Sequence, residues 1–169
     1  MLEVDLRTTT DRVLCAILLN PPLRPAERTI TYRNVTAALS TTGCQQLSLT
    51  NLLAVPSKDL PSLNRIKISE QEIAASREAL RQAIMYGDEV LVAWGMGGAT
   101  GALKQLLNSQ VTYVREVLHE RGIHSVWALQ GRPRHPSRWR QYLGPQKNRV
   151  SGDSFQDRLN QALVPLQLN

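Results

Sequence analysis

The sequence has few cysteines, and their placement excludes a Cys-x-x-Cys motif and a framework of disulfide bonds. Only two occur in 169 residues, Cys15 inside an apolar run and Cys44 after a glycine, so there is neither a Cys-x-x-Cys motif nor a disulfide framework. Reduced thiols fit a protein of the cytoplasm. The histidines, His119, His124 and His135, stand at no spacing typical of metal ligands, and we expect no metal site.

Long hydrophobic runs are also missing. No apolar segment approaches the roughly 20 residues that a membrane helix needs, and the first residues lack the basic and apolar regions of a signal peptide. The composition, with 42% hydrophobic and 20% charged residues, is that of an ordinary globular protein. The length suits one domain, which we place over residues 1–169, and we expect a cytoplasmic monomer.

Acidic residues are absent from residues 121–152. Basic and aromatic side chains are interleaved through this segment: Arg121, Arg132, Arg134, Arg138, Arg140, Lys147 and Arg149 with Trp127, Trp139 and Tyr142. A solvated surface of a basic protein is one explanation, but the aromatics and the nearby glycines favour a polyanion-binding surface. The net charge of +6 matters less than this clustering, from which we expect a nucleic acid as the partner.

Short apolar runs alternate with helical patterns along the whole chain. The runs at Val13–Leu19, Leu47–Val55, Val90–Trp94 and Val126–Leu129 are typical of strands buried on both faces. The sequence therefore predicts a three-layer α/β/α domain whose central sheet has four parallel strands joined by right-handed crossovers.

Apolar residues at helical spacing predict the helices between and after these strands. The stripes are Tyr32, Val35 and Leu39; Ile73, Leu80 and Ile84 behind a Ser69-x-x-Glu72 capping box; residues 103–118 ahead of a Gly122 stop; and Phe155, Leu159 and Leu163. Residues 56–68 are the expected long loop.

Four polar strings follow the four predicted strands. They are LLNPP at residues 18–22, TNLLAVP at 50–56, VAWGMGG at 92–98 and RHPS at 134–137. Because parallel strands emerge at one edge of a sheet, the strings are expected to meet where open α/β sheets bind their ligands. A nucleotide base could occupy such a site, beside the basic segment.

Each string also has an ordinary structural explanation. Asn20 before two prolines can simply end a strand, and Asn51 can hold a neighbouring loop rather than read a base edge. The glycines from 95 to 101 suit a tight turn or an anion at a helix N-terminus, but match neither the NTPase phosphate loop nor the dinucleotide fingerprint, and we expect no cofactor. His135 can donate a hydrogen bond or titrate near neutral pH, though most loop histidines do neither.

In order and spacing, the strings resemble motifs of the uracil-DNA glycosylase superfamily. LLNPP is similar to its water-activating motif, TNLLAVP to the strand whose asparagine reads the base, VLVAWGMGGA to its apolar strand ending in Trp-Gly, and RHPSRW to its His-Pro-Ser loop. The strings LNPP, NLLAVP, AWG and RHPS look closer still to a bacterial and phage domain family of unassigned function.

The resemblance implies a uracil-DNA glycosylase-like fold and gives residues roles. Asn20 would position the attacking water, His135 would stabilise charge on the departing base, and Asn51 would read the base edge beside Pro21. Tyr32 would stack on the base, unless it belongs to the core face of its helix. The implied DNA contacts are Gly97, Gly98, Ser137, Arg134, Arg138, Trp139 and Arg140, with Arg138 or Trp139 as the wedge that replaces a flipped nucleotide.

We therefore expect a monofunctional DNA glycosylase that removes a damaged or modified base, a pyrimidine above all, in repair or antiphage defence. Asn20 stands where the fastest branch has a carboxylate, and an amide cannot take a proton from water, so hydrolysis should be slow or need a good leaving group. Two alternatives stay open. One is a non-catalytic DNA-binding module that retains the fold, and the other is an enzyme acting on free nucleosides or nucleotides, which would need no basic aromatic surface.

Overall fold

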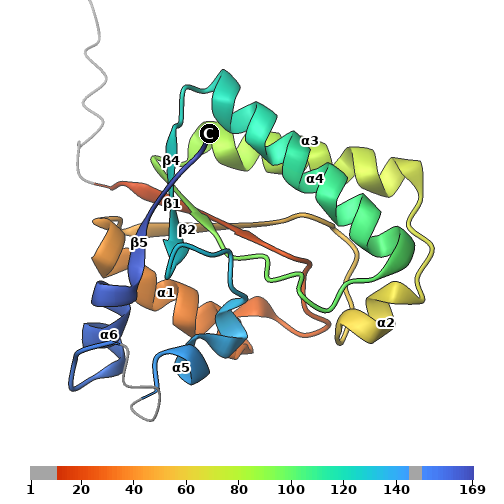
Figure 1. Cartoon of the computed structure of the whole chain (residues 1–169). Coiled ribbons are helices and arrows are strands. Elements are labelled where there is room, and N and C mark those ends of the chain that lie inside the picture. Colours follow the sequence, from red (N-terminus) through yellow and green to blue (C-terminus); the bar gives the residue numbers. More distant parts are fainter. Residues whose placement is uncertain (1–10, 145–149) are drawn as a thin grey trace, which may run out of the picture.

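The computed structural model describes residues 11–144 and 150–169 and has a mixed α/β fold with a five-stranded sheet (Figure 1). Lys147 and Arg149 of the basic segment lie outside the described residues. The elements in chain order are β1 (Val13–Leu18), η1 (Ala26–Arg28), α1 (Ile30–Thr42), β2 (Gln46–Asn51), α2 (Leu60–Asn64), α3 (Glu70–Tyr86), β3 (Glu89–Val92), α4 (Gly101–Glu120), β4 (Ser125–Leu129), η2 (Pro136–Arg138), α5 (Trp139–Tyr142), α6 (Phe155–Ala162) and β5 (Leu163–Gln167).

The strand order is β2-β1-β3-β4-β5, and the first four strands are parallel. β5 pairs with β4 in the antiparallel direction, with Leu163 opposite Leu129 and Gln167 opposite Ser125. The expectation of a purely parallel, four-stranded sheet is therefore corrected. Leu163, expected to complete the stripe of the last helix, is instead the first residue of the fifth strand.

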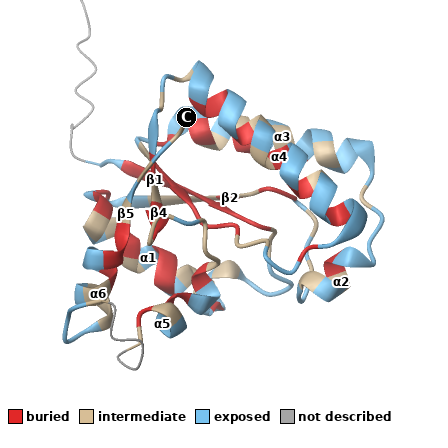
Figure 2. Ribbon diagram, viewed as in Figure 1, coloured by how far each residue is buried: buried red, intermediate tan, exposed pale blue. Residues whose placement is uncertain are grey.

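Helices cover both faces of this sheet. α3 and α4 lie together on one side, whereas α1, α5 and α6 lie on the other (Figure 1). β1 is buried along its whole length because it lies between β2 and β3 and beneath helices on both faces (Figure 2). Its side chains alternate between two core clusters, with Cys15 and Ile17 in the cluster of α3 and α4 and Leu14, Ala16 and Leu18 in the cluster of α1 and α6.

α3 begins as the sequence predicts. The hydroxyl of Ser69 accepts from the backbone N–H of Glu72, and the carboxylate of Glu72 accepts from the backbone N–H of Ser69. This reciprocal capping box satisfies two N–H groups that a helix start would otherwise leave unpaired. Among the helices of the described residues, none is long and apolar enough to span a bilayer.

The inner face of α1 is less apolar than its sequence stripe suggests. Val35 is fully buried, but Tyr32 and Leu39 are only half-buried. Asn34, which is 1% exposed, takes an inward position beside Val35. α1 therefore places the buried amide of Asn34 on the side of the sheet where η2 packs.

Candidate functional site

The parallel pairing delivers three of the polar strings to neighbouring strand ends. Leu18 of β1 is opposite Asn51, the last residue of β2, and Ile17 is opposite Val92, the last residue of β3. Asn20 thus lies just beyond the end of β1, beside the exits of β2 and β3. The carboxyl edge of the sheet therefore gathers these strings, as the sequence predicts.

The fourth string reaches this edge through Gly95. The backbone N–H of Gly95 donates to the carbonyl of Pro133 at 2.6 Å. A Cβ at position 95 would lie 2.5 Å from both Cβ and the backbone N of His135, and Gly95 has a φ of +48°. Only glycine satisfies both conditions, because it has no Cβ and adopts positive φ without strain. The Trp-Gly string therefore fixes the position of His135 relative to β3.

The hydrogen bonds of His135 define its tautomer, that is, which ring nitrogen carries the proton. The backbone N–H of Ser137 donates to Nδ1 at 3.2 Å, and the Ser137 hydroxyl lies 2.8 Å from the same nitrogen. Since Nδ1 accepts a hydrogen bond, the proton of the neutral ring is on Nε2. Burial, with a smaller effect from the charge of Arg138, lowers the pKa of His135 below its ordinary value. At neutral pH the ring is thus an uncharged donor, and no other described residue bonds to Nε2.

Asn34 supports the His135 loop from α1. Its Nδ2 donates to the carbonyl of Pro136 at 2.7 Å, whereas its Oδ1 is buried without a partner among the described residues. Sequence reasoning missed this residue because a search for apolar stripes passes over amides. Its place beside Val35, on the inward side of a predicted helix, was the available signal.

Asn20 is bound to the segment that follows β2. Its Nδ2 donates to the carbonyl of Val55 at 3.0 Å and to the hydroxyl of Ser57 at 2.9 Å, with a longer contact of 3.4 Å to the carbonyl of half-buried Pro21. The amide hydrogens are therefore committed to holding the loop. Oδ1, to which no described residue donates, can orient a water molecule but cannot take its proton.

Asn51 presents an unsatisfied acceptor at the end of β2. Its Oδ1 is buried and has no hydrogen-bond partner among the described residues. A buried polar atom in this state costs about 1–3 kcal/mol. A ligand that brings an N–H or O–H donor to this atom would remove that cost.

The chain beyond Asn51 is held by polar side chains that the sequence did not single out. Gln110 of α4, which is fully buried, donates from Nε2 to the carbonyl of Leu52 at 2.7 Å. Buried Ser76 of α3 accepts from the backbone N–H of Ala54 at 2.9 Å. These bonds fix the β2 exit from the helices of one face, while Asn20 fixes it from β1.

Trp139 is not at the surface, so its expected role as a DNA contact or wedge is wrong. Its side chain is fully buried in the cluster of α1 and α6, and its Nε1–H donates to the carbonyl of Arg134 at 2.9 Å. A buried indole cannot enter between base pairs. The aromatic residues among the arginines are thus in part core residues.

The arginines of the expected DNA surface differ in availability. Arg138 and Arg140 are exposed, whereas Arg134 is half-buried and its guanidinium lies 3.9 Å from the ring centroid of Tyr142. Arg140 lies 4.2 Å above the ring of Phe155. None of the three arginines forms an ion pair with a carboxylate of the described residues.

The remaining candidates take separate positions. Gly97 and Gly98 form an exposed turn ahead of α4, and Ser137 is exposed in η2. Tyr32 lies in the first turn of α1, half-buried, and no hydrogen bond of the described residues joins its side chain to Asn20 or Asn51. The geometry therefore brings together Asn20 with the β2 exit and Gly95 with His135.

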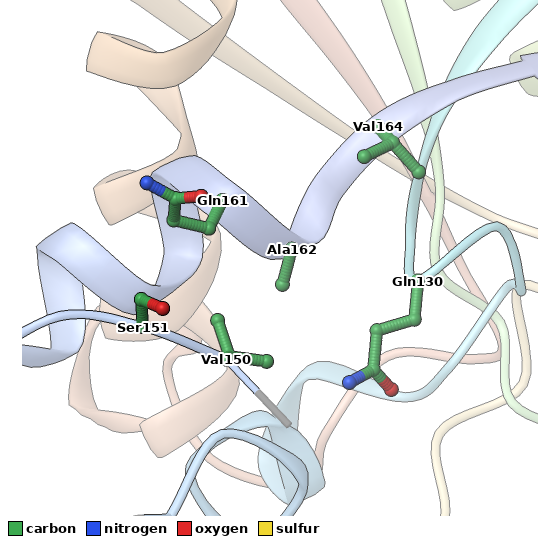
Figure 3. Close-up of a pocket in the computed structure, with 6 residues that line it drawn as sticks. All are labelled: Gln130, Val150, Ser151, Gln161, Ala162 and Val164. Carbon is green, nitrogen blue, oxygen red and sulfur yellow. The ribbon is translucent and has the colours of Figure 1, made fainter. Parts of the chain in front are cut away.

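Two hollows stand out in the described part of the chain. The larger, about 250 Å³, has polar amides and small side chains but no charged group: Gln130, Val150, Ser151, Gln161, Ala162 and Val164 (Figure 3). The smaller, about 160 Å³, is lined by Ile30, Arg33, Asn34 and Arg140. Neither is lined by Asn20, Asn51 or His135.

Thiol chemistry receives no support from the geometry. Cys15 and Cys44 are both buried and free, and burial raises the pKa of both thiols, that of Cys15 to about 12. Both thiols are therefore protonated at neutral pH. Within residues 11–144 and 150–169, no three His, Cys, Asp or Glu side chains gather as ligands for a metal ion.

In the comparison with known proteins, one family model covers the part of the chain that contains the four strings. A family model described as Protein of unknown function (DUF1643) matches residues 1–137. No curated protein and no solved structure matches. The matched range ends at Ser137, the last residue of the RHPS string, so α5, α6 and β5 lie beyond it.

Proposed function

The chain belongs to the DUF1643 family, and we propose that it is a DNA glycosylase with a uracil-DNA glycosylase-like fold. It would hydrolyse the N-glycosidic bond of a damaged or modified base, a pyrimidine above all, after that nucleotide is flipped from the duplex. The reaction would need no cofactor and would leave an abasic site in the DNA.

The observation that carries the proposal is that His135 is a neutral hydrogen-bond donor, with its ring proton on Nε2. Negative charge develops on the base as the N-glycosidic bond breaks, and a preorganised donor stabilises such charge. His135 offers Nε2–H because the N–H of Ser137 occupies Nδ1, and its lowered pKa keeps the ring neutral at pH 7. A neutral donor serves here without the cost of burying a cation.

The two strand-end amides fit the remaining roles. Oδ1 of Asn20 would orient the water that attacks the sugar, while its Nδ2 stays bound to Val55 and Ser57. Oδ1 of Asn51 would accept a hydrogen bond from a base N–H, such as the exocyclic amine of a cytosine. This contact would satisfy an acceptor that the protein alone leaves unpaired.

DNA would be held around these residues by the exposed groups of the same edge. The backbone N–H groups of Gly97 and Gly98 would contact phosphates, and Ser137 would donate to one only after its hydroxyl turns away from Nδ1 of His135. With Trp139 buried, Arg138 remains as the wedge that fills the space of the flipped nucleotide.

A second candidate is favoured by one observation. Both amide hydrogens of Asn20 hold the β2 exit, and Asn20 carries no carboxylate to take a proton from water. A non-catalytic DNA-binding module would use the same fold and the same basic residues, with Asn20 as a structural side chain.

The test is a base-release assay by mass spectrometry on ordinary, uracil-containing and heavily modified phage DNA. We expect a free base from one of them, and a loss of about 100-fold or more in His135→Gln, the scale for removal of one preorganised donor. His119→Gln, at an exposed position of α4, is the matched control. Salt-sensitive DNA binding without release of any base would instead favour the binding module.

A further inference from the structure

The two outer strands of the sheet, β2 and β5, have different free edges. At β5, the backbone N–H of Leu168 donates to the carbonyl of His124 at 2.9 Å. The carbonyl of Ala162 accepts from the backbone N–H of Gln130 at 2.7 Å. Because strand residues face their neighbour alternately, Pro165, three residues from both Ala162 and Leu168, faces away from β4. Proline has no N–H, so this exposed residue leaves the free edge of β5 without a donor at its centre, which protects an edge strand from further pairing.

The backbone of β2 alternates in the same way. The N–H of Gln46 donates to the carbonyl of Arg12 at 3.1 Å. The N–H of Leu52, just after the strand, donates to the carbonyl of Leu18 at 2.8 Å. Even-numbered residues of β2 therefore turn their backbone groups toward β1. The odd-numbered residues turn theirs outward, at Leu47, Leu49 and Asn51.

The free edge of β2 carries none of the protection found at β5. No hydrogen bond joins its outward backbone groups to another described residue. Its sequence, QLSLTN, contains no proline, no glycine and no charged side chain. Most of its residues are half-buried, whereas every residue of β1 is buried (Figure 2). An open, uncharged strand edge is a template for pairing with another strand.

We propose that β2 pairs with β2 of a second copy of this chain, in the antiparallel direction about a two-fold axis at Leu49. In a two-fold dimer the same surface of both copies must be complementary to itself. With Leu49 opposite the partner's Leu49, Leu47 lies opposite the partner's Asn51. Every outward N–H of the strand then meets an outward carbonyl. The two five-stranded sheets would form one continuous sheet held by main-chain hydrogen bonds.

The side chains of β2 also match in this register, which favours a second copy over a strand of unrelated sequence. Leu47 and Leu49 pack against the cluster of α1 and α6, so they lie on that face of the sheet. Ser48 and Thr50 lie on the opposite face, because side chains alternate along a strand. Across the axis, Leu49 meets its own copy and Ser48 meets the partner's Thr50. An apolar pair and a hydroxyl pair both stabilise neighbouring strands, and no charge lies opposite its own copy.

The pairing would also hold one end of the candidate site. The backbone N–H of Asn51 would donate to the carbonyl of the partner's Leu47, which fixes the last residue of β2. The two-fold axis turns the second sheet end for end, so the carboxyl edges of the two sheets would point in opposite directions, each with its own His135. This dimer differs from the monomer expected from the sequence. It does not depend on glycosylase activity, because dimerisation is measured without DNA.

The first experiment is sedimentation equilibrium of the full chain over a range of concentrations. We expect the mass of two chains for the wild type. Leu49→Lys should raise the dissociation constant of the dimer more than about tenfold, because it places two like charges opposite each other at the axis. Gln167→Lys is the matched control, since it adds the same charge at an exposed position of β5, and it should dimerise as the wild type does. Urea denaturation checks that both variants fold.

The second experiment traps the pair with a disulfide. Hydrogen-bonded residues opposite each other in antiparallel strands have Cα atoms about 5.5 Å apart, a separation that a disulfide spans. Mild oxidation of Leu49→Cys should therefore give a covalent dimer, whereas Gln167→Cys should stay uncrosslinked. The natural thiols, Cys15 and Cys44, are buried. The proposal is overturned if the wild type is a monomer at every concentration, or if it forms a dimer that Leu49→Lys leaves intact and Leu49→Cys fails to crosslink.

Discussion

Gly95 and His135 pack backbone against backbone at the end of β3, with no room for a side chain between them. The contact joins the β3 exit to the loop that follows β4. It makes the position of the histidine depend on the identity of a residue that carries no functional group.

Gly95→Ala should therefore damage both stability and the site. The new methyl would meet Cβ and N of His135 at 2.5 Å, and a φ of +48° disfavours any L-residue. The positive φ costs about 1–2 kcal/mol and the overpacking about 1–3 kcal/mol. Urea denaturation should show a loss of about 2–5 kcal/mol in the free energy of unfolding, together with loss of base release.

Gly97→Ala is the control for this change. A Cβ at position 97 meets nothing within 4 Å, and the substitution keeps the backbone N–H. Its free energy of unfolding should stay within about 0.5 kcal/mol of the wild type. Equal effects of the two substitutions would contradict the role given to Gly95.

His135 should make stability depend on pH in a defined direction. Its pKa in the folded protein lies below the value of about 6.5 expected in the unfolded chain, so the unfolded state binds more protons in this region. The free energy of unfolding should be highest above about pH 6.5 and fall as the pH is lowered. Urea denaturation at pH 7.5 and 5.5 measures the fall.

His135→Gln should reduce that fall, because the substituted side chain takes up no proton. His119→Gln controls for the loss of a histidine elsewhere. If His135→Gln kept the full wild-type pH dependence, the lowered pKa of His135 would not be its cause.

Asn51→Leu should separate stability from function. The substitution removes a buried acceptor that has no partner, so the free energy of unfolding should be unchanged or slightly raised. Base release should be lost, because the contact to the base edge is gone. Thermal and urea unfolding with the base-release assay give both quantities.

Asn34→Leu provides the contrast to that substitution. It leaves the carbonyl of Pro136 without its donor and should cost about 1–3 kcal/mol. A similar loss of stability in Asn51→Leu would show that Asn51 is a structural residue.

Trp139 and Arg138 are neighbours in sequence with different expected effects. Trp139→Ala removes a fully buried side chain and should cost about 3–5 kcal/mol of stability. Arg138→Ala should leave stability nearly unchanged but reduce base release from duplex DNA several-fold. On single-stranded DNA the Arg138 variant should act as the wild type does, because no base pair has to open. Equal losses on both substrates would remove Arg138 from the wedge role.

Much of the sheet could be predicted from the sequence because its inner strands, β1, β3 and β4, are short and mostly apolar. β1 is the clearest case, since every one of its residues is buried. The capping box at Ser69 was predictable for a local reason, as both of its bonds join residues three apart. The end of β2 was placed too late, because Leu52 and Leu53 stay buried after the strand ends at Asn51.

The features that the sequence did not predict depend on distant contacts. β5 was missed because Leu163 continues the helical spacing of Phe155 and Leu159, and only pairing with β4 ends the helix there. Trp139 reads as a surface residue among arginines, yet its indole finds a carbonyl partner at Arg134 in the interior.

The polar residues of the site show the same difference between local patterns and distant contacts. Asn20, Asn51 and His135 were found because they stand at strand ends or beside prolines, where local patterns are informative. Asn34 and Gln110 were not, because each serves a loop far away in the chain, at Pro136 and at Leu52. Side chains that position other residues leave little local trace in a sequence.

Because β5 is synthesised last, the protein is exposed to aggregation for an interval during its synthesis. Until Leu163–Gln167 pairs with β4, the outer edge of β4 has unpaired backbone groups, and the core beside α1 lacks Leu159 and Leu163. Open strand edges and uncovered apolar faces attract other chains. The nascent protein is therefore most prone to aggregate after its four parallel strands have formed and before the last strand emerges from the ribosome.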